Sequence, residues 1–252
     1  MTAFFNGATY PFRALRTLAA HPRLWSYVVV PIIVNIAIAL TLYIGLLTAG
    51  FRLIDGAIAN TTLGVALTIL LEIVLGIALL LLAGFLLVRF GVVLGSPWYG
   101  KLSEQLELLR TGQAPPAEPL TPGGIARDLW RALSFEAKKL LLFLPIGGVL
   151  LLLNLIPVAG QFINIVGWIL LGELIVCLDF FDGPQERRRI SFRQKLGAVQ
   201  RSLPASLGFG LVSLALVSIP FVNLLAIPIC VAAGTLFVCD YLLVETPQLA
   251  AR

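Results

Sequence analysis

The chain has 252 residues, of which 59% are hydrophobic and 12% are charged, and it carries a net charge of +5 at neutral pH. With a mean hydropathy of +0.97, it has more apolar surface than one soluble core can bury, so the composition excludes a soluble domain and predicts an integral membrane protein. Three cysteines and one histidine, without a Gly-rich phosphate loop, argue against disulfide, metal, haem and nucleotide chemistry. We therefore expect no metal, no cofactor, no nucleic-acid partner and no enzymatic activity.

The N-terminal part of the chain contains an interfacial segment followed by a membrane span. Residues 1–23 combine apolar residues with three arginines in a basic amphipathic pattern, which predicts a helix on the membrane surface. Residues 24–51 carry no charge, and Trp25 and Tyr27 stand at their start, where interfacial aromatic residues belong. These residues are the first predicted transmembrane helix.

A second long helix with a cytoplasmic extension is predicted for residues 62–110. Its apolar part contains one charged residue, Glu72, and is stopped by Arg89. Further on, a Gly-Ser-Pro step that ends at Pro97 is expected to bend or restart the helix. The prolines of residues 111–124 predict a soluble linker.

Two charge-free stretches, one within residues 125–178 and one within residues 202–245, are each broken by an Ile-Pro step, at Pro157 and at Pro220. The arms on either side of each break are about 15 residues long, or ~22 Å at 1.5 Å per residue. Such arms are shorter than the ~30 Å hydrocarbon core of a bilayer. We therefore predict two re-entrant helical hairpins, with the basic residues 179–201 forming an interfacial segment between them.

Together these elements predict a single membrane domain, residues 1–252, of the all-α class. It would contain two long transmembrane helices, two re-entrant hairpins that enter the membrane only partly, and interfacial amphipathic helices. In this layout every lysine and arginine except Arg52 lies on one side, which predicts an inner-membrane protein with cytoplasmic termini. Hairpins that crossed the bilayer fully would give the same distribution, so charge predicts the orientation and not the hairpin depth.

Few charged side chains lie in or beside the apolar segments. Glu72 is either a pore-lining or ion-coupled acid or a group near the outer headgroups, because a carboxylate is costly in lipid. Glu173 is expected to form a structural ion pair. Its candidate partners are Lys138, Lys139 and the arginines 187–189. The arginine triplet itself indicates an orientation anchor or a mouth that gathers anions.

Polar side chains also lie near the hairpin breaks. They have two interpretations: amides that cap broken helix ends, or the lining of an anion pathway in which helix N-termini point into the membrane. The candidates for pore-lining or hairpin-break roles are Glu72, Asn154, Gln161, Asn164 and Asn223.

Several short motifs follow one another along the chain in a characteristic order. They are His21-Pro22-Arg23-Leu24, Gly95-Ser96-Pro97-Trp98, Leu102-Ser103-Glu104-Gln105-Leu106-Glu107, Glu136-Ala137-Lys138-Lys139, Ile156-Pro157-Val158-Ala159-Gly160, Leu178-Asp179-Phe180-Phe181 and Ile219-Pro220-Phe221-Val222-Asn223. In order and spacing they resemble the CysZ-type sulfate permeases, a family that includes the etoposide-induced 2.4 proteins. The resemblance covers nearly the whole chain.

The resemblance implies two long spanning helices with two partly inserted hairpins, assembly as a homo-oligomer in the lipid bilayer, and inward passage of sulfate for cysteine synthesis. It also implies an anion site at the start of the first transmembrane helix, where the permeases carry a Gly-Leu-Arg motif. Aligned on Leu24, this chain has Arg23 in place of the glycine and Trp25-Ser26 in place of the arginine. The anion-binding candidates are Arg23, Leu24, Trp25 and Ser26.

The leading prediction is a channel or permease for a small inorganic anion, with sulfate or a related oxyanion as its solute. The alternative is a non-transporting membrane scaffold of the same family, whose hairpins wedge into one leaflet while its cytoplasmic helices bind a partner.

Overall fold

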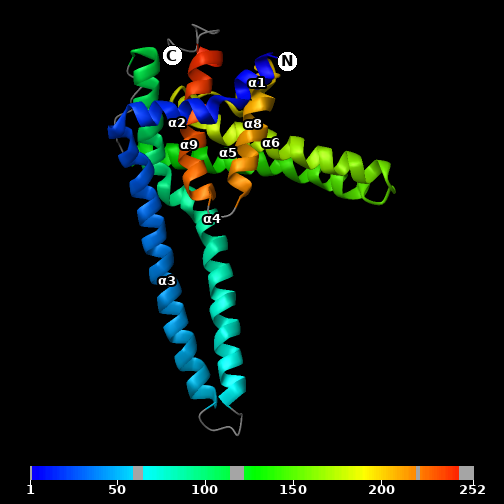
Figure 1. The fold of residues 1–252 in the computed structure, drawn as a ribbon. Helices are drawn as coiled ribbons and strands as arrows, with labels where there is room; N and C mark the ends of the chain where they lie inside the picture. Colours follow the sequence, from blue (N-terminus) through cyan, green and yellow to red (C-terminus); the bar gives the residue numbers. More distant parts are fainter. Residues whose placement is uncertain (1, 59–64, 114–121, 220–221, 244–252) are drawn as a thin grey trace.

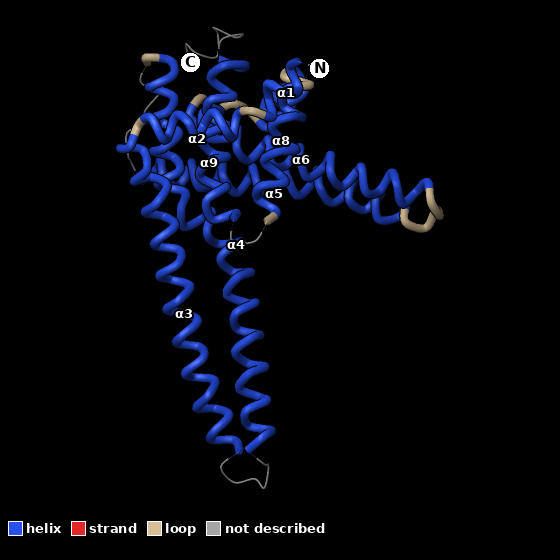
Figure 2. Tube along the Cα trace, in the orientation of Figure 1, coloured by secondary structure: helices blue, strands red, loops and turns tan. Residues whose placement is uncertain are grey.

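The computed structural model describes residues 2–58, 65–113, 122–219 and 222–243. Within these ranges every regular element is a helix, as Figure 2 shows. The all-α prediction is therefore confirmed. The helices form three parts that we call the stalk, the arm and the head (Figure 1).

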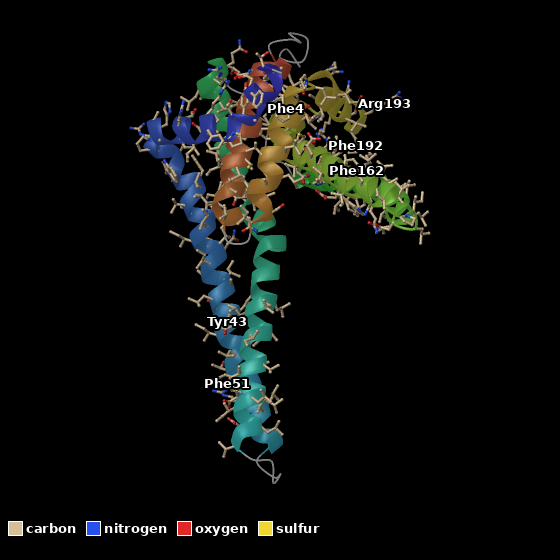
Figure 3. All side chains as sticks on the ribbon, turned by 45° about the vertical axis from the view of Figure 1, so that its right-hand side comes forward. Phe4, Tyr43, Phe51, Phe162, Phe192 and Arg193 are labelled. Atoms are coloured by element: carbon tan, nitrogen blue, oxygen red, sulfur yellow. The ribbon has the colours of Figure 1, made fainter. Side chains whose placement is uncertain are left out.

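The stalk is an antiparallel pair of long helices, α3 (Ser26–Ile58) and α4 (Val65–Thr111). At 1.5 Å per residue the 33 residues of α3 extend roughly 50 Å, more than the ~30 Å hydrocarbon core. Tyr43 of α3 donates a hydrogen bond to the carbonyl of Gly76 on α4 (3.4 Å). Figure 3 shows side chains projecting outward along the stalk, and large apolar residues such as Leu53 are 74% exposed. This outward apolar surface suits lipid rather than water.

Pro97 does not end α4, which runs as one helix to Thr111 and bends where it enters the head (Figure 1). The expected restart of the helix at Pro97 is therefore absent.

The arm is a second helical hairpin that projects sideways from the head (Figure 1). It consists of α5 (Pro122–Leu153) and α6 (Ala159–Arg187), and its turn contains Pro157, the predicted break. The two helices have 32 and 29 residues. Both helices continue beyond the charge-free arms predicted from the sequence, into segments whose charged groups pair with one another.

The head packs short helices from both ends of the chain against the bases of the stalk and the arm. At the N-terminus these are α1 (Thr2–Ala8), α2 (Tyr10–Ala20) and the 3-10 turn η1 (Pro22–Trp25). At the C-terminus they are α7 (Phe192–Arg201), α8 (Ala205–Ser218), α9 (Val222–Phe237) and the π-helical η2 (Val238–Leu243).

The core of the head is aromatic. Phe237 stacks on Phe181 with ring centroids 4.7 Å apart and on Tyr241 at 4.6 Å. Tyr10 meets Phe237 edge-on at 5.1 Å, which joins α2 to α9. Such pairs stabilise a core beyond the area that they bury.

Three helical segments of the described residues are long and apolar enough to cross a membrane: Pro22–Gly56, Ala159–Arg187 and Val222–Leu243. A fourth results if α7 and α8, which meet at 104°, form one broken span. The chain is therefore an all-helical protein with three or four candidate membrane spans. In α4 the apolar stretch among the described residues is shorter, Leu67–Leu82.

Candidate functional site

The predicted anion site lies where η1 meets α3. Arg23 is exposed, Leu24 is 5% exposed, Trp25 is half-buried and Ser26 is exposed. The Leu24 amide donates to the His21 carbonyl (2.9 Å), and the Ser26 hydroxyl donates to the Arg23 carbonyl (2.9 Å). These two donors are therefore satisfied within the turn. The Arg23 guanidinium, at the positive end of a long helix, is the group with charge to offer an anion.

Glu72 lies on the stalk, half-buried and one turn from Gly76 toward the end of the stalk farthest from the head. The predicted anion site lies at the head end of α3 (Figure 1). The structure thus separates Glu72 and Arg23 by most of the length of the stalk and does not bring them into one site.

The polar side chains near the hairpin breaks fall into two groups that do not converge. Asn154, Gln161 and Asn164 belong to the outer end of the arm, where Asn164 donates a side-chain hydrogen bond to Asn154 (3.0 Å). Asn223 lies in the first turn of α9 at the head and is 4% exposed. Its backbone N–H donates a hydrogen bond to the Ile219 carbonyl (3.0 Å). The bond between Asn164 and Asn154 joins α6 to the turn of the arm.

A buried charge network, which the sequence reasoning missed, joins the stalk to the base of the arm. Glu107 of α4 is 1% exposed and contacts Arg187 Nη2 through Oε2 (2.6 Å) and Arg188 Nη2 through Oε1 (2.5 Å). Arg187 also donates to Ser103 Oγ (3.0 Å), and Ser103 accepts from Thr235 of α9 (2.8 Å). Two members of the predicted arginine triplet thus pair with a buried carboxylate, an interaction that the sequence reasoning did not include.

Lys195 lies at the centre of a second network at the junction of α6 and α7. Its ammonium contacts Asp182 (2.5 Å) and Glu186 (2.6 Å) and lies 4.5 Å from the centre of the Phe135 ring. Arg131 of α5 contacts the other Glu186 oxygen (3.1 Å). Residues 179–201 therefore hold α5, α6 and α7 together and do not only rest on a membrane.

The ion pair predicted for Glu173 is wrong. Its carboxylate accepts a hydrogen bond from the Cys177 thiol (3.2 Å). A Cβ added at Gly210 would lie 2.4 Å from Glu173 Cγ, so the glycine leaves room for the buried acid. Lys139, one of the expected partners, binds Asp179 and Glu136 instead.

One sequence signal could have indicated Glu107. It lies four residues after Ser103 and next to Leu106, so it shares the apolar face of its helix. An acid on such a face requires a buried cation. Sequence spacing does not reveal which cation, because the arginines lie 80 residues further on.

Apolar membrane-length helices, packed at one end around buried ion pairs, define a helical multi-span membrane protein. Residues 10–228 match the family described as "Sulfate transporter CysZ/Etoposide-induced protein 2.4". The chain belongs to this family, as its motifs predicted.

Relatives named sulfate transporter CysZ align with most of the chain. Those of Salmonella typhimurium and Salmonella enteritidis are each 29% identical over 231 residues, which make up 91% of this chain and 90% of each relative. The relative from Pectobacterium atrosepticum is 31% identical over 159 residues, 63% of this chain and 57% of its own length.

Proposed function

We propose that this protein is a sulfate permease of the inner membrane that passes sulfate inward for cysteine synthesis. The observation that carries the proposal is the alignment with the Salmonella sulfate transporters over 91% of the chain. An alignment of that extent includes the stalk, the arm and most of the head. Substrate handling in such proteins depends on how these parts are arranged, so near-complete coverage supports the whole activity.

In this proposal the stalk crosses the bilayer and the arm is re-entrant. With the stalk along the membrane normal, the arm runs roughly parallel to the membrane plane (Figure 1). It therefore lies within the cytoplasmic leaflet and does not cross the bilayer. The support is the direction of the arm and not its length. The second hairpin has shorter helices, 14 residues in α8 and 16 in α9, or roughly 21 and 24 Å.

Exposed apolar residues along the arm support contact with lipid or with another copy of the chain. Leu141 and Phe162 are each 70% exposed, and Val158 at the turn is 82% exposed. Apolar surface of this extent on one element requires a cover. We infer a homo-oligomer in the bilayer, with both termini in the cytoplasm.

The anion site proposed for this permease is the start of α3. Arg23 supplies a full positive charge beside the partial positive charge of the helix N-terminus. Loss of one charge-assisted hydrogen bond costs about 1.5–3 kcal/mol of binding free energy, which lowers the affinity for the anion roughly tenfold or more.

Uptake of labelled sulfate into liposomes that contain the purified protein tests the proposal. We expect uptake above that of empty liposomes, a reduction of about tenfold in Arg23→Ala, and an increase in Trp25→Arg, which restores an arginine. Arg16→Ala is the matched control, because Arg16 is an exposed arginine on the neighbouring helix α2.

One observation favours the scaffold alternative. The Leu24 N–H and the Ser26 hydroxyl already donate hydrogen bonds within the turn, so they are not available to an anion. A folded wild-type protein that gives no sulfate uptake would support the scaffold and overturn the permease. Equal sulfate uptake by the wild-type, Arg23→Ala and Arg16→Ala proteins would instead show that Arg23 does not form the anion site.

A further inference from the structure

Residues from the N-terminal segment, from α4 and from α9 and η2 line a cavity of about 270 Å³ on the side of α2 that faces α4 and η2. The residues from the N-terminal segment follow one another at spacings of three or four, so they share one helical face. Its lining comprises Tyr10, Arg13, Thr17 and His21 from the N-terminal segment, Leu106, Leu109 and Arg110 from α4, and Leu236 and Asp240 from α9 and η2. At ~30 Å³ per molecule the space would hold roughly nine waters.

Among the described residues that line this cavity, the carboxylate is Asp240, and its two oxygens both accept hydrogen bonds. Asp240 accepts from Arg110 Nε (2.6 Å) through one oxygen and from the Tyr10 hydroxyl (2.9 Å) through the other. Burial, together with the hydrogen bond to Asp240, raises the pKa of Tyr10 above its ordinary value, so the hydroxyl stays a donor. Arg110 thus balances the charge of Asp240 and Arg13 is left in excess, so the cavity is net positive.

The two guanidinium groups retain donors for a ligand. A guanidinium carries five N–H groups. In the described part of the chain, Arg110 gives one to Asp240, and Arg13 bonds Asn6 while its Cζ lies 4.9 Å from the centre of the Tyr10 ring. Paired N–H groups of a guanidinium match two oxygens of one oxyanion.

We propose that this cavity binds a tetrahedral oxyanion group, held by Arg13 and Arg110, at a site separate from the start of α3. The group has two possible sources: free sulfate or phosphate, or the phosphate of an anionic lipid headgroup. α2 exposes Phe12 (59%) and Leu15 (40%) beside the cavity, which places the site at a membrane surface. Basic pockets of this kind at the cytoplasmic side bind anionic headgroups.

Calorimetry and native mass spectrometry on one set of variants test the proposal. All variants carry Arg23→Ala, which removes the site at the start of α3 from the measurement. Sodium sulfate and sodium phosphate are titrated into detergent-purified protein, and retention of phosphatidylglycerol is compared with that of phosphatidylcholine. We expect Arg13→Gln to weaken binding about tenfold or more, while Arg16→Gln on the same helix has no effect.

Each outcome decides one question. Loss of ion binding in Arg13→Gln assigns the site to a free oxyanion, and loss of phosphatidylglycerol retention alone assigns it to lipid. The same affinities in Arg13→Gln and in its parent, or an equal loss in Arg16→Gln, overturn the site. Because sulfate uptake is measured separately, failure of the permease proposal leaves these readings unaffected.

Discussion

Glu107 illustrates how a single residue connects distant parts of this protein. It is 1% exposed, and its carboxylate forms ion pairs with Arg187 and Arg188 at the base of the arm. In the described part of the chain the Nε groups of both arginines are buried without a hydrogen-bond partner. Glu107 is the carboxylate that both arginines share, beside the hydrogen bonds of Arg187 to Ser103 and of Arg188 to the Pro184 carbonyl. A buried charge whose partner is removed is far more costly than a broken surface pair.

We predict that Glu107→Ala destabilises the protein by about 3–5 kcal/mol, since it leaves two arginines without their anion. For a chain of this length that corresponds to a midpoint lower by roughly 6–12 °C or more. Thermal unfolding in detergent, followed by circular dichroism, measures it. Glu104→Ala is the control, because Glu104 pairs with the exposed Lys101 and should cost about 0–1 kcal/mol. Equal midpoints in the two variants would contradict a structural role for the network.

At this scale the sequence predicted that charged residues matter but not how they pair. None of the candidate partners of Glu173 contacts it, because ion-pair geometry depends on which helix faces which, and spacing along the chain does not contain that information. The predicted anion residues are adjacent in sequence, so their proximity was certain. The hydrogen bond that occupies the Ser26 hydroxyl was not foreseeable.

Among the helices, the contact between α1 and α8 shows how close packing depends on glycine. A Cβ at Gly208 would lie 2.0 Å from the Phe4 carbonyl oxygen, and one at Gly7 would lie 1.9 Å from that of Ala205. No real Cβ fits at those distances. Small residues let helix backbones approach in membrane proteins, and here they fix the N-terminal helix to the head.

We predict that Gly208→Ala loosens this contact and costs about 1–3 kcal/mol or more, because overpacking displaces a backbone and not a flexible side chain. The readout is the unfolding midpoint in detergent together with the elution profile on size exclusion. Gly45→Ala is a matched control in α3, since nothing lies within 4 Å of its added Cβ. Alanine there should be neutral or slightly stabilising. A Gly208→Ala protein as stable as the Gly45→Ala protein would show that the helices can separate at no cost.

Hydrophobic patterning predicts the position of the first helix break better than the full length of the helices on either side of it. The first break was placed correctly at Pro157, since an Ile-Pro step interrupts a helix for local reasons. The predicted arms cover only the uncharged stretch, whereas α5 and α6 extend beyond it, because charged residues continue both helices when they have partners across the arm. The second break, at Pro220, and most of the linker 111–124 lie outside the described residues.

On the scale of the whole molecule, the arm projects sideways from the head while the stalk extends away from it (Figure 1). The sequence predicts re-entrant hairpins from length alone, whereas our proposal of a re-entrant arm rests on its direction relative to the stalk (Figure 1). No sequence pattern contains that angle, because it results from the packing of α6 against α8 and α9 in the head. The three cysteines, Cys177, Cys230 and Cys239, are each at most 2% exposed, so the protein has little background in thiol labelling.

We predict the membrane arrangement from three introduced cysteines, Gln113→Cys beyond the end of α4, Asp55→Cys near the end of the stalk farthest from the head, and Val158→Cys at the turn of the arm. All three positions are exposed in the structure. In intact cells a membrane-impermeant thiol reagent should label Asp55→Cys, because the stalk crosses the bilayer, and should label Gln113→Cys only after permeabilisation. Val158→Cys should react poorly in both states, since an arm within one leaflet keeps its turn in lipid. Labelling of Val158→Cys from outside at the rate of Asp55→Cys would mean that the arm crosses fully, and strong outside labelling of Gln113→Cys would reverse the proposed orientation.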